Sequence, residues 1–147
     1  MTPKDIQEIE TTFSIALPQA YVDAICPYSF PSESSLANYA MLDSKEWLVQ
    51  LNQRLRTNGW NGADWPQHYF VIGYDGGECY YFLDVSQNDT KVFIISKEGC
   101  DIGDAEVYAP TLTDFIDADL EADEEIDDAV HRDDSHRESK EWWELWE

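Results

Sequence analysis

The chain opens with two stretches in which hydrophobic residues recur every three or four positions, the spacing of an amphipathic helix. The first covers residues 3–13, where Ile6, Ile9 and Phe13 form the stripe and Thr2 has the position of an N-cap. A second, shorter stripe ends before a proline, which cannot continue a helix, and consists of Tyr21, Val22 and Ile25. The pattern predicts two short helices.

A third helix is expected after a loop rich in Pro and Ser. Residues 36–42 (LANYAML) suit a short strand. Asp43 and Glu46 then have the spacing of a capping box, in which the first side chain accepts a hydrogen bond from the backbone three residues later. A hydrophobic stripe follows, formed by Trp47, Leu48, Leu51 and Leu55. We expect a helix that ends at Asn58-Gly59.

The centre of the chain is dense in aromatic and β-branched residues, which favour strands. They form three runs: YFVIGY at 69–74, CYYFLDV at 79–85 and VFIIS at 92–96. Turn-forming residues separate the runs, so the three strands are predicted to form an antiparallel meander. Residues 105–108 are expected to add a fourth short strand.

A last helix and an extension complete the expected fold. Thr111 and Asp114 repeat the capping-box spacing ahead of Leu112, Phe115 and Ile116. We therefore expect an α+β fold, a single domain in which an antiparallel meander sheet is flanked by N-terminal and C-terminal helices over residues 1–120. Residues 121–147 are interpreted as an acidic helical extension packed on the same domain, whose indoles are Trp142, Trp143 and Trp146.

Composition supports one hydrophobic core and restricts the partners. Of 147 residues, 43% are hydrophobic and 14% aromatic, which is ample for folding. The net charge is −22, from 31 acidic and 9 basic residues, and residues 117–147, with 14 acids and 3 bases, hold half of it. Such a charge repels phosphate backbones and anionic membranes, so direct binding of nucleic acid or membrane is not expected. A basic partner is favoured.

The cysteines and the N-terminus indicate a cytoplasmic protein. Cys26, Cys79 and Cys100 are an odd number at wide spacing, without the pairs typical of a zinc site or a disulfide framework. The first residues have neither a basic region nor a hydrophobic core typical of a signal peptide. We expect reduced thiols and neither export nor a membrane anchor.

No residue pattern favours catalysis or a bound metal. His68 with Cys79 or Cys100 is the best nucleophile arrangement, but a cysteine within an aromatic strand is more often a small core residue. A polar run near the C-terminus offers metal ligands, yet such a run is more often simply solvated; its members are His131, Asp133, Asp134 and His136. We expect no catalytic residue, no metal site and no cofactor.

The order of several short motifs resembles a known superfamily. Ile6, Ile9 and Glu10 lead to a Leu-Pro-x-x-Tyr step at 17–21, and YFVIGYDGGECYYFLD at 69–84 is an Ile-Gly, an acidic glycine-rich turn and an aromatic strand. Together with the closing Leu-x-x-Phe-Ile helix, these motifs are similar to the SUKH superfamily over residues 3–120. The resemblance implies an α+β fold that binds a partner and catalyses no reaction.

The resemblance also implies a function. Bacterial members are largely immunity proteins of polymorphic toxin systems, and fungal relatives act in cell-wall-assembly signalling. We therefore expect an immunity protein, a monomer or weak dimer, that binds and neutralises a basic protein toxin such as a nuclease. The alternatives left open are a scaffold or regulatory adaptor of the same fold, an acidic DNA mimic and a small hydrolase.

The expected partner-binding residues are aromatic and acidic side chains beside the predicted turns. Protein interfaces are commonly anchored by a buried Trp or Tyr with charges around it. The candidates are Trp60, Trp65, Tyr74, Asp75, Glu78, Asp101, Asp104 and Glu106. Two alternatives stay open: the two tryptophans plug an edge of the core, and the last three acids belong to a plain solvated loop.

Overall fold

A computed structural model describes residues 1–87, 89–98 and 100–125. The predicted helix of Trp142, Trp143 and Trp146 lies outside these residues. The elements follow one another as α1 (Pro3–Phe13), α2 (Gln19–Ile25), η1 (Leu36–Ala40), α3 (Lys45–Asn58), β1 (Tyr69–Tyr74), β2 (Cys79–Asp84), β3 (Val92–Ser96), η2 (Ile102–Asp104) and β4 (Glu106–Ala109). A C-terminal helix then begins at residue 112 and is described as far as residue 125.

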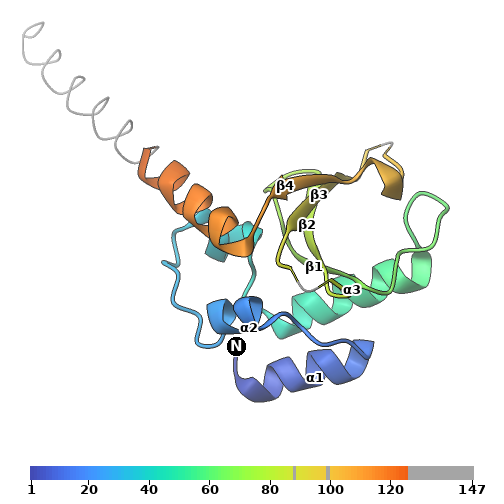
Figure 1. Ribbon diagram of the computed structural model, residues 1–147, viewed down its shortest axis with the longest axis horizontal. Coiled ribbons are helices and arrows are strands. Elements are labelled where there is room, and N and C mark those ends of the chain that lie inside the picture. The colour runs from blue at the N-terminus through green and yellow to red at the C-terminus, as the bar shows by residue number, and fades with distance from the viewer. Residues whose placement is uncertain (88, 99, 126–147) are drawn as a thin grey trace, which may run out of the picture.

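The sheet is a four-stranded antiparallel meander in the order β1-β2-β3-β4. Figure 1 shows it curved, with α3 running alongside β1 and the C-terminal helix leaving from β4. The predicted α+β class, single domain and meander are confirmed, with the fourth strand shifted by one residue. At the free edge, β4 carries Val107 and Tyr108, which are the large hydrophobic side chains that the described part of the chain leaves exposed.

Both faces of β1 and β2 are buried, which explains why these two strands are almost continuously hydrophobic. Successive residues of a strand point to opposite faces. Tyr81 and Leu83 of β2 pack in a cluster with the N-terminal helices and Phe115 of the C-terminal helix. Tyr80 and Phe82 pack on the other side with residues of α3 and the loop that follows it.

Thr2 is the N-cap of α1, as predicted, and it forms a capping box with Asp5. The backbone N–H of Asp5 donates to Thr2 Oγ1 at 3.2 Å, and the N–H of Thr2 donates to the Asp5 carboxylate at 3.0 Å. Ile6 and Ile9 are buried beneath the helix. The observed start of α1 and its buried face therefore agree with the sequence pattern.

The predicted strand at 36–42 is wrong. Residues 36–40 form the π-helical turn η1, with Leu36 and Ala40 buried. These two residues are four positions apart, which is a helical spacing, and the polar side chain of Asn38 donates back to the Ser34 carbonyl at 3.0 Å. The hydrophobic content of the segment thus reflects one buried face of a turn.

The predicted N-cap of α3 is also wrong by one residue. Ser44, not Asp43, begins the helix, because Ser44 Oγ accepts from the backbone N–H of Trp47 at 3.2 Å. The Asp43 carboxylate instead forms an ion pair with the N-terminal ammonium of Met1. Local spacing had predicted Asp43 as the N-cap, but its carboxylate binds a group that is distant in the sequence.

Gly73 is the point where β1 touches η1. A Cβ at this position would lie 2.2 Å from the Ala40 carbonyl oxygen and 2.3 Å from that of Tyr39. These are backbone atoms, which cannot move aside as a flexible side chain can. The strand lacks a side chain here because the π-helical turn occupies the space.

Replacing Gly73 by alanine is expected to lower the free energy of unfolding by about 3 kcal/mol, because the added methyl group displaces backbone. Urea unfolding measures the change. Gly103→Ala is the matched control, since nothing lies within 4 Å of a Cβ at that position. Equal stability of the two variants would contradict the close approach.

The C-terminal helix is held to the loop before η1 by a side-chain contact. The Asp123 carboxylate accepts from the backbone N–H and the hydroxyl of Ser35, both at 3.0 Å. One turn earlier on the same helix, burial and the nearby Asp123 charge raise the pKa of Asp119 to about 6. The charged form of Asp119 is therefore disfavoured in the folded state.

Because the pKa of Asp119 is raised from 3.8 in the unfolded reference to about 6 in the fold, this group lowers stability as the pH rises from 4 to 6. Asp119→Asn is expected to increase the free energy of unfolding at pH 7 by about 1 kcal/mol, a figure reduced for solvent screening. The gain should shrink at pH 4. Urea unfolding across this range tests it, with exposed Asp117→Asn as the control. A pH-independent gain would refute the assignment.

Candidate functional site

The candidate site lies where two turns of the meander meet. In an antiparallel meander, the β1–β2 turn and the β3–β4 connection occupy the same end of the sheet. The backbone N–H of Lys97 donates to the Glu78 carbonyl at 2.7 Å and joins them. We call this region, residues 74–79 and 97–106, the hairpin end.

The β1–β2 turn is organised by the side chain of Asp75. One carboxylate oxygen accepts from the backbone N–H of Gly77 at 2.9 Å and of Cys79 at 3.1 Å. Burial alone would raise the pKa of Asp75, but these backbone donors outweigh it and hold the pKa below its usual value. Gly76 has a φ of 86°, which suits glycine. The turn therefore holds a fixed negative charge at neutral pH.

Two of the predicted partner-binding residues are buried. Trp60 is 6% exposed and Trp65 is 1% exposed. Trp60 Nε1 donates to the Cys100 carbonyl at 2.9 Å, and Trp65 Nε1 donates to the Tyr69 carbonyl at 3.2 Å. Of the two alternatives that the sequence left open, plugging the core edge is the one that the structure shows. Trp60 therefore supports the hairpin end at Cys100, whereas Trp65 packs near the opposite end of β1.

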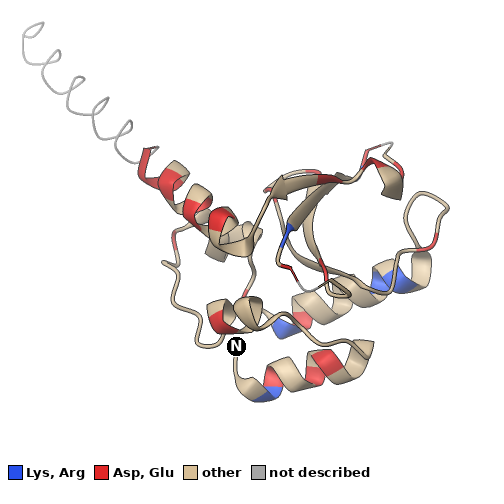
Figure 2. Ribbon diagram, in the orientation of Figure 1, with Lys and Arg blue, Asp and Glu red and all other residues tan. Residues whose placement is uncertain are grey.

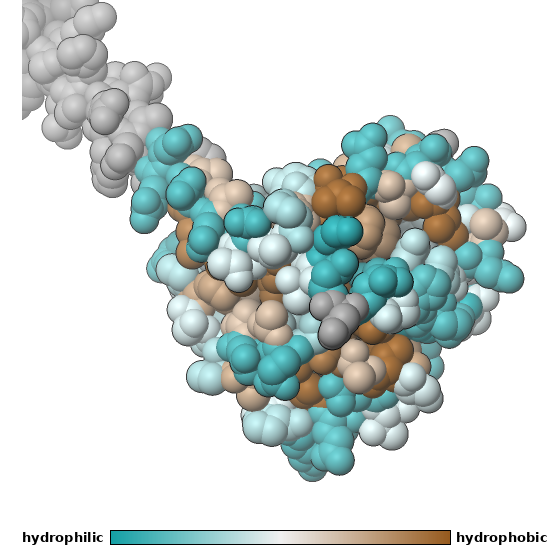
Figure 3. Space-filling view, in the orientation of Figure 1, coloured by the Kyte–Doolittle hydropathy of each residue, from teal (hydrophilic) through white to brown (hydrophobic). Residues whose placement is uncertain are grey.

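The other predicted residues gather at the hairpin end. Tyr74 is half-buried there. The exposed acids are Asp75, Glu78, Asp101, Asp104 and Glu106. Figure 2 shows further acidic residues on α1 and on the described part of the C-terminal helix, whereas Lys and Arg are few. On the face shown in Figure 3, hydrophobic residues form separate small areas within a mainly hydrophilic surface.

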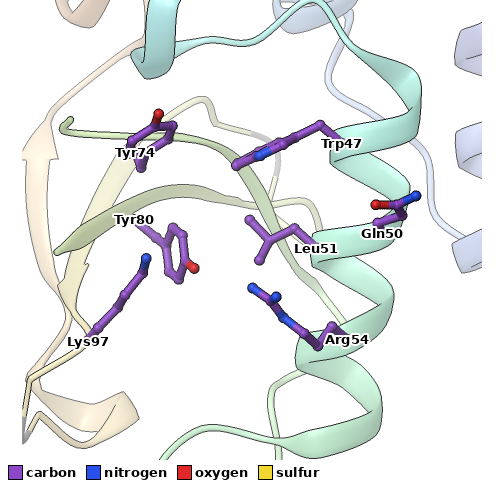
Figure 4. Close-up of a pocket in the computed structure, with 7 residues that line it drawn as sticks. All are labelled: Trp47, Gln50, Leu51, Arg54, Tyr74, Tyr80 and Lys97. Atoms are coloured by element: carbon purple, nitrogen blue, oxygen red, sulfur yellow. The ribbon is translucent and has the colours of Figure 1, made fainter. Parts of the chain in front are cut away.

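A pocket of about 490 Å³ opens between α3 and the hairpin end. Its lining is aromatic and cationic and, among the described residues, includes no acid: Trp47, Gln50, Leu51, Arg54, Tyr74, Tyr80 and Lys97. Figure 4 shows Trp47 facing Tyr74 at one side and the two cations reaching toward the Tyr80 ring from opposite sides. Sequence reasoning identified only Tyr74 of this set.

The aromatic walls of the pocket are fixed by mutual packing. The Trp47 and Tyr74 rings stack with centroids 6.0 Å apart and an interplanar angle of 25°. Tyr39 of η1 packs on Tyr74 at 5.8 Å. Since η1, α3 and β1 each supply one ring, the shape of the pocket depends on how these three elements pack.

A buried amide sets the distance between α3 and β1. Asn52 is fully buried; its Nδ2 donates to the Val71 carbonyl at 3.0 Å and its Oδ1 accepts from the Val71 N–H at 2.8 Å. Asn52 Nδ2 also donates to the Leu48 carbonyl at 2.8 Å. The Arg56 guanidinium donates to the Tyr69 carbonyl at 3.1 Å, so α3 covers this edge of the sheet. Leu51 and Arg54 lie on the same helix and are positioned by this tie.

His68 and Cys79, considered from the sequence as parts of a nucleophile arrangement and not favoured, lie far apart. His68 precedes β1 and its carbonyl accepts from the Val85 N–H after β2, whereas Cys79 begins β2 at the opposite end of the sheet. Burial and the Asp75 charge also raise the pKa of the Cys79 thiol, which disfavours the thiolate. The described residues contain no group of three or more His, Cys, Asp or Glu able to hold a metal ion. None of the described helices is long and apolar enough to cross a membrane.

The fold and the site define a small α+β domain with a meander sheet and an open aromatic pocket at its hairpin end. The chain belongs to the SMI1 / KNR4 family (SUKH-1), whose family model matches residues 1–118. The resemblance to the SUKH superfamily is thereby confirmed. This is not an enzyme family; its known roles are in immunity and regulation. No curated protein matches the chain.

Asn52→Ala is expected to lower the free energy of unfolding by about 3 kcal/mol, because the N–H and carbonyl of Val71 lose their buried partner. Urea unfolding measures the loss. The neighbouring exposed residue on α3 provides the control, Gln53→Ala, which should leave stability within about 0.5 kcal/mol of the parent. Similar values for both variants would show that the amide does not hold α3 to β1.

Proposed function

We propose that this chain is an immunity protein that binds a cognate bacterial protein toxin, one with a basic surface such as a nuclease, and neutralises it. The observation that carries the proposal is the hairpin end, where five exposed acids lie at the same end of the sheet as a pocket lined by aromatic side chains. Interfaces that bind tightly combine aromatic anchors with complementary charge at the rim. Family membership supports a protein partner and an immunity or regulatory role.

The physical mechanism is occlusion. The acids of the hairpin end attract a basic cleft over a distance of about 8 Å, the screening length at physiological salt. The aromatic side chains then exclude water from the contact, which strengthens each charge pair inside it. The immunity protein acts in the cytoplasm of the cell that makes it, in equal stoichiometry with the toxin, without a cofactor and without catalysis.

The first experiment captures the partner. The tagged full-length chain is used to retain proteins from its own cell lysate at low and moderate salt, and mass spectrometry identifies them. We expect one basic protein in equal stoichiometry that is toxic when expressed alone and harmless when this chain is co-expressed. Capture of signalling proteins without toxicity would replace immunity with the adaptor function.

The kinetics of the captured pair give a sharper prediction. Glu78→Gln, Asp104→Asn and Glu106→Gln, combined in one variant, are expected to slow association about tenfold at low salt, with little change in dissociation, because rim charges act on encounter. The matched control removes the same charge from the C-terminal helix with Asp117→Asn, Glu121→Gln and Glu124→Gln. Surface plasmon resonance measures both. Equal slowing by the two variants would mean that net charge matters and the hairpin end does not.

A further inference from the structure

We infer that the pocket between α3 and the hairpin end receives a carboxylate side chain of the partner protein, flanked in the partner by basic residues. The inference rests on the proposed function and names the chemistry of the contact. The pocket is lined by cations, whereas the chain as a whole is strongly acidic. In a chain of net charge −22, a cationic pocket is unexpected and needs a physical account.

Positive charge is scarce in this chain, and part of it is placed at the pocket. The described part of the chain contains six Lys and Arg residues, and two of them, Arg54 and Lys97, line this one pocket. Elsewhere, Lys45 pairs with Asp5 and Glu8, and Lys91 pairs with Asp89.

No described carboxylate forms an ion pair with Arg54 or Lys97. Both cations therefore keep the capacity to bind an anion that comes from outside the described chain. A guanidinium offers a carboxylate a planar pair of N–H donors.

Lys97 is held in the pocket by a neutral aromatic ring. The Lys97 ammonium lies 4.3 Å from the centroid of the Tyr80 ring, a cation–π contact that fixes the charge without neutralising it. Leu51 and Trp47 provide the neighbouring apolar wall. A side chain with a short apolar stem and one terminal charge, as in Glu or Asp, matches this combination of wall and cations.

Exposed acids at the same end of the sheet select between the anions that the pocket could bind. Asp75, Glu78 and Asp101 stand exposed at the same end of the sheet, and a phosphate ester with two negative charges is repelled by them more strongly than a single carboxylate. A carboxylate carried on a basic segment makes two favourable interactions. The carboxylate meets the cations of the pocket, and its neighbouring Lys or Arg residues meet the exposed acids. The charges therefore favour a protein segment over a nucleotide.

The test uses defined probes on the full chain. Acetyl-Lys-Phe-Glu-Lys-amide, the same peptide with Gln in place of Glu, and adenosine monophosphate are titrated while the Trp47 indole and Arg54 Nε–H signals are followed by NMR. We expect the Glu peptide to shift both signals and to bind at least fivefold more tightly than the Gln peptide. Equal binding of the two peptides, no binding of either, or tighter binding of the nucleotide would overturn the inference.

Variants assign the effect to the pocket. Arg54→Gln and Lys97→Gln, both at exposed positions, should each remove the preference for the Glu peptide, and Lys4→Gln on α1 should retain it. If the captured partner binds the Arg54→Gln/Lys97→Gln double variant as tightly as the parent chain, immunity stands and the pocket inference fails. If no partner is captured but the Glu peptide still binds through both cations, the proposed function fails and the pocket remains a carboxylate site.

Discussion

The structure depends on one buried side chain that behaves as a piece of β-strand. The carboxamide of Asn52 offers Val71 both a donor and an acceptor, as a neighbouring strand would, and so closes the edge of β1 from the side of α3. Because a buried polar group without partners is costly, this geometry permits little sliding of the helix. The depth of the pocket, whose two walls belong to α3 and the sheet, follows from that constraint.

The sequence predicts what local periodicity determines. The three hydrophobic runs of the meander and the capped stripe of α1 lie within a few residues of their predicted bounds, because each is specified by its own neighbours in the chain. The turn at 36–40 was not predicted, because its conformation depends on the space left by Gly73, some thirty residues later in the chain. The ion pair of Asp43 was not predicted, because its partner, the N-terminal ammonium, is distant in the sequence. Of the predicted extension at 121–147, residues 126–147 with the tryptophans lie outside the described residues and stay a prediction.

The candidate site was predictable in part for the same reason. Acids next to turns are visible in a sequence, and the structure places them together because a meander brings its alternate turns to one end. The pocket was not visible, although Trp47, Leu51 and Arg54 recur at helical spacing. Nothing local shows that this strip of α3 lines a pocket, or that Lys97, which follows β3, lies over the Tyr80 ring in the same pocket. An acidic surface with a cationic centre gives a partner two opposite charges to match, which is more selective than attraction alone.

The two edges of the sheet differ in how they are covered, and this affects contacts between copies of the chain. The edge of β1 is covered by α3, while in the described part of the chain no strand pairs with the outer side of β4, where Val107 and Tyr108 are exposed. Open edges invite pairing between copies and aggregation. Here the edge strand is only four residues long and begins with the charged Glu106, two features that weaken pairing between edges. Pairing of two copies at this edge would therefore form only a few backbone hydrogen bonds.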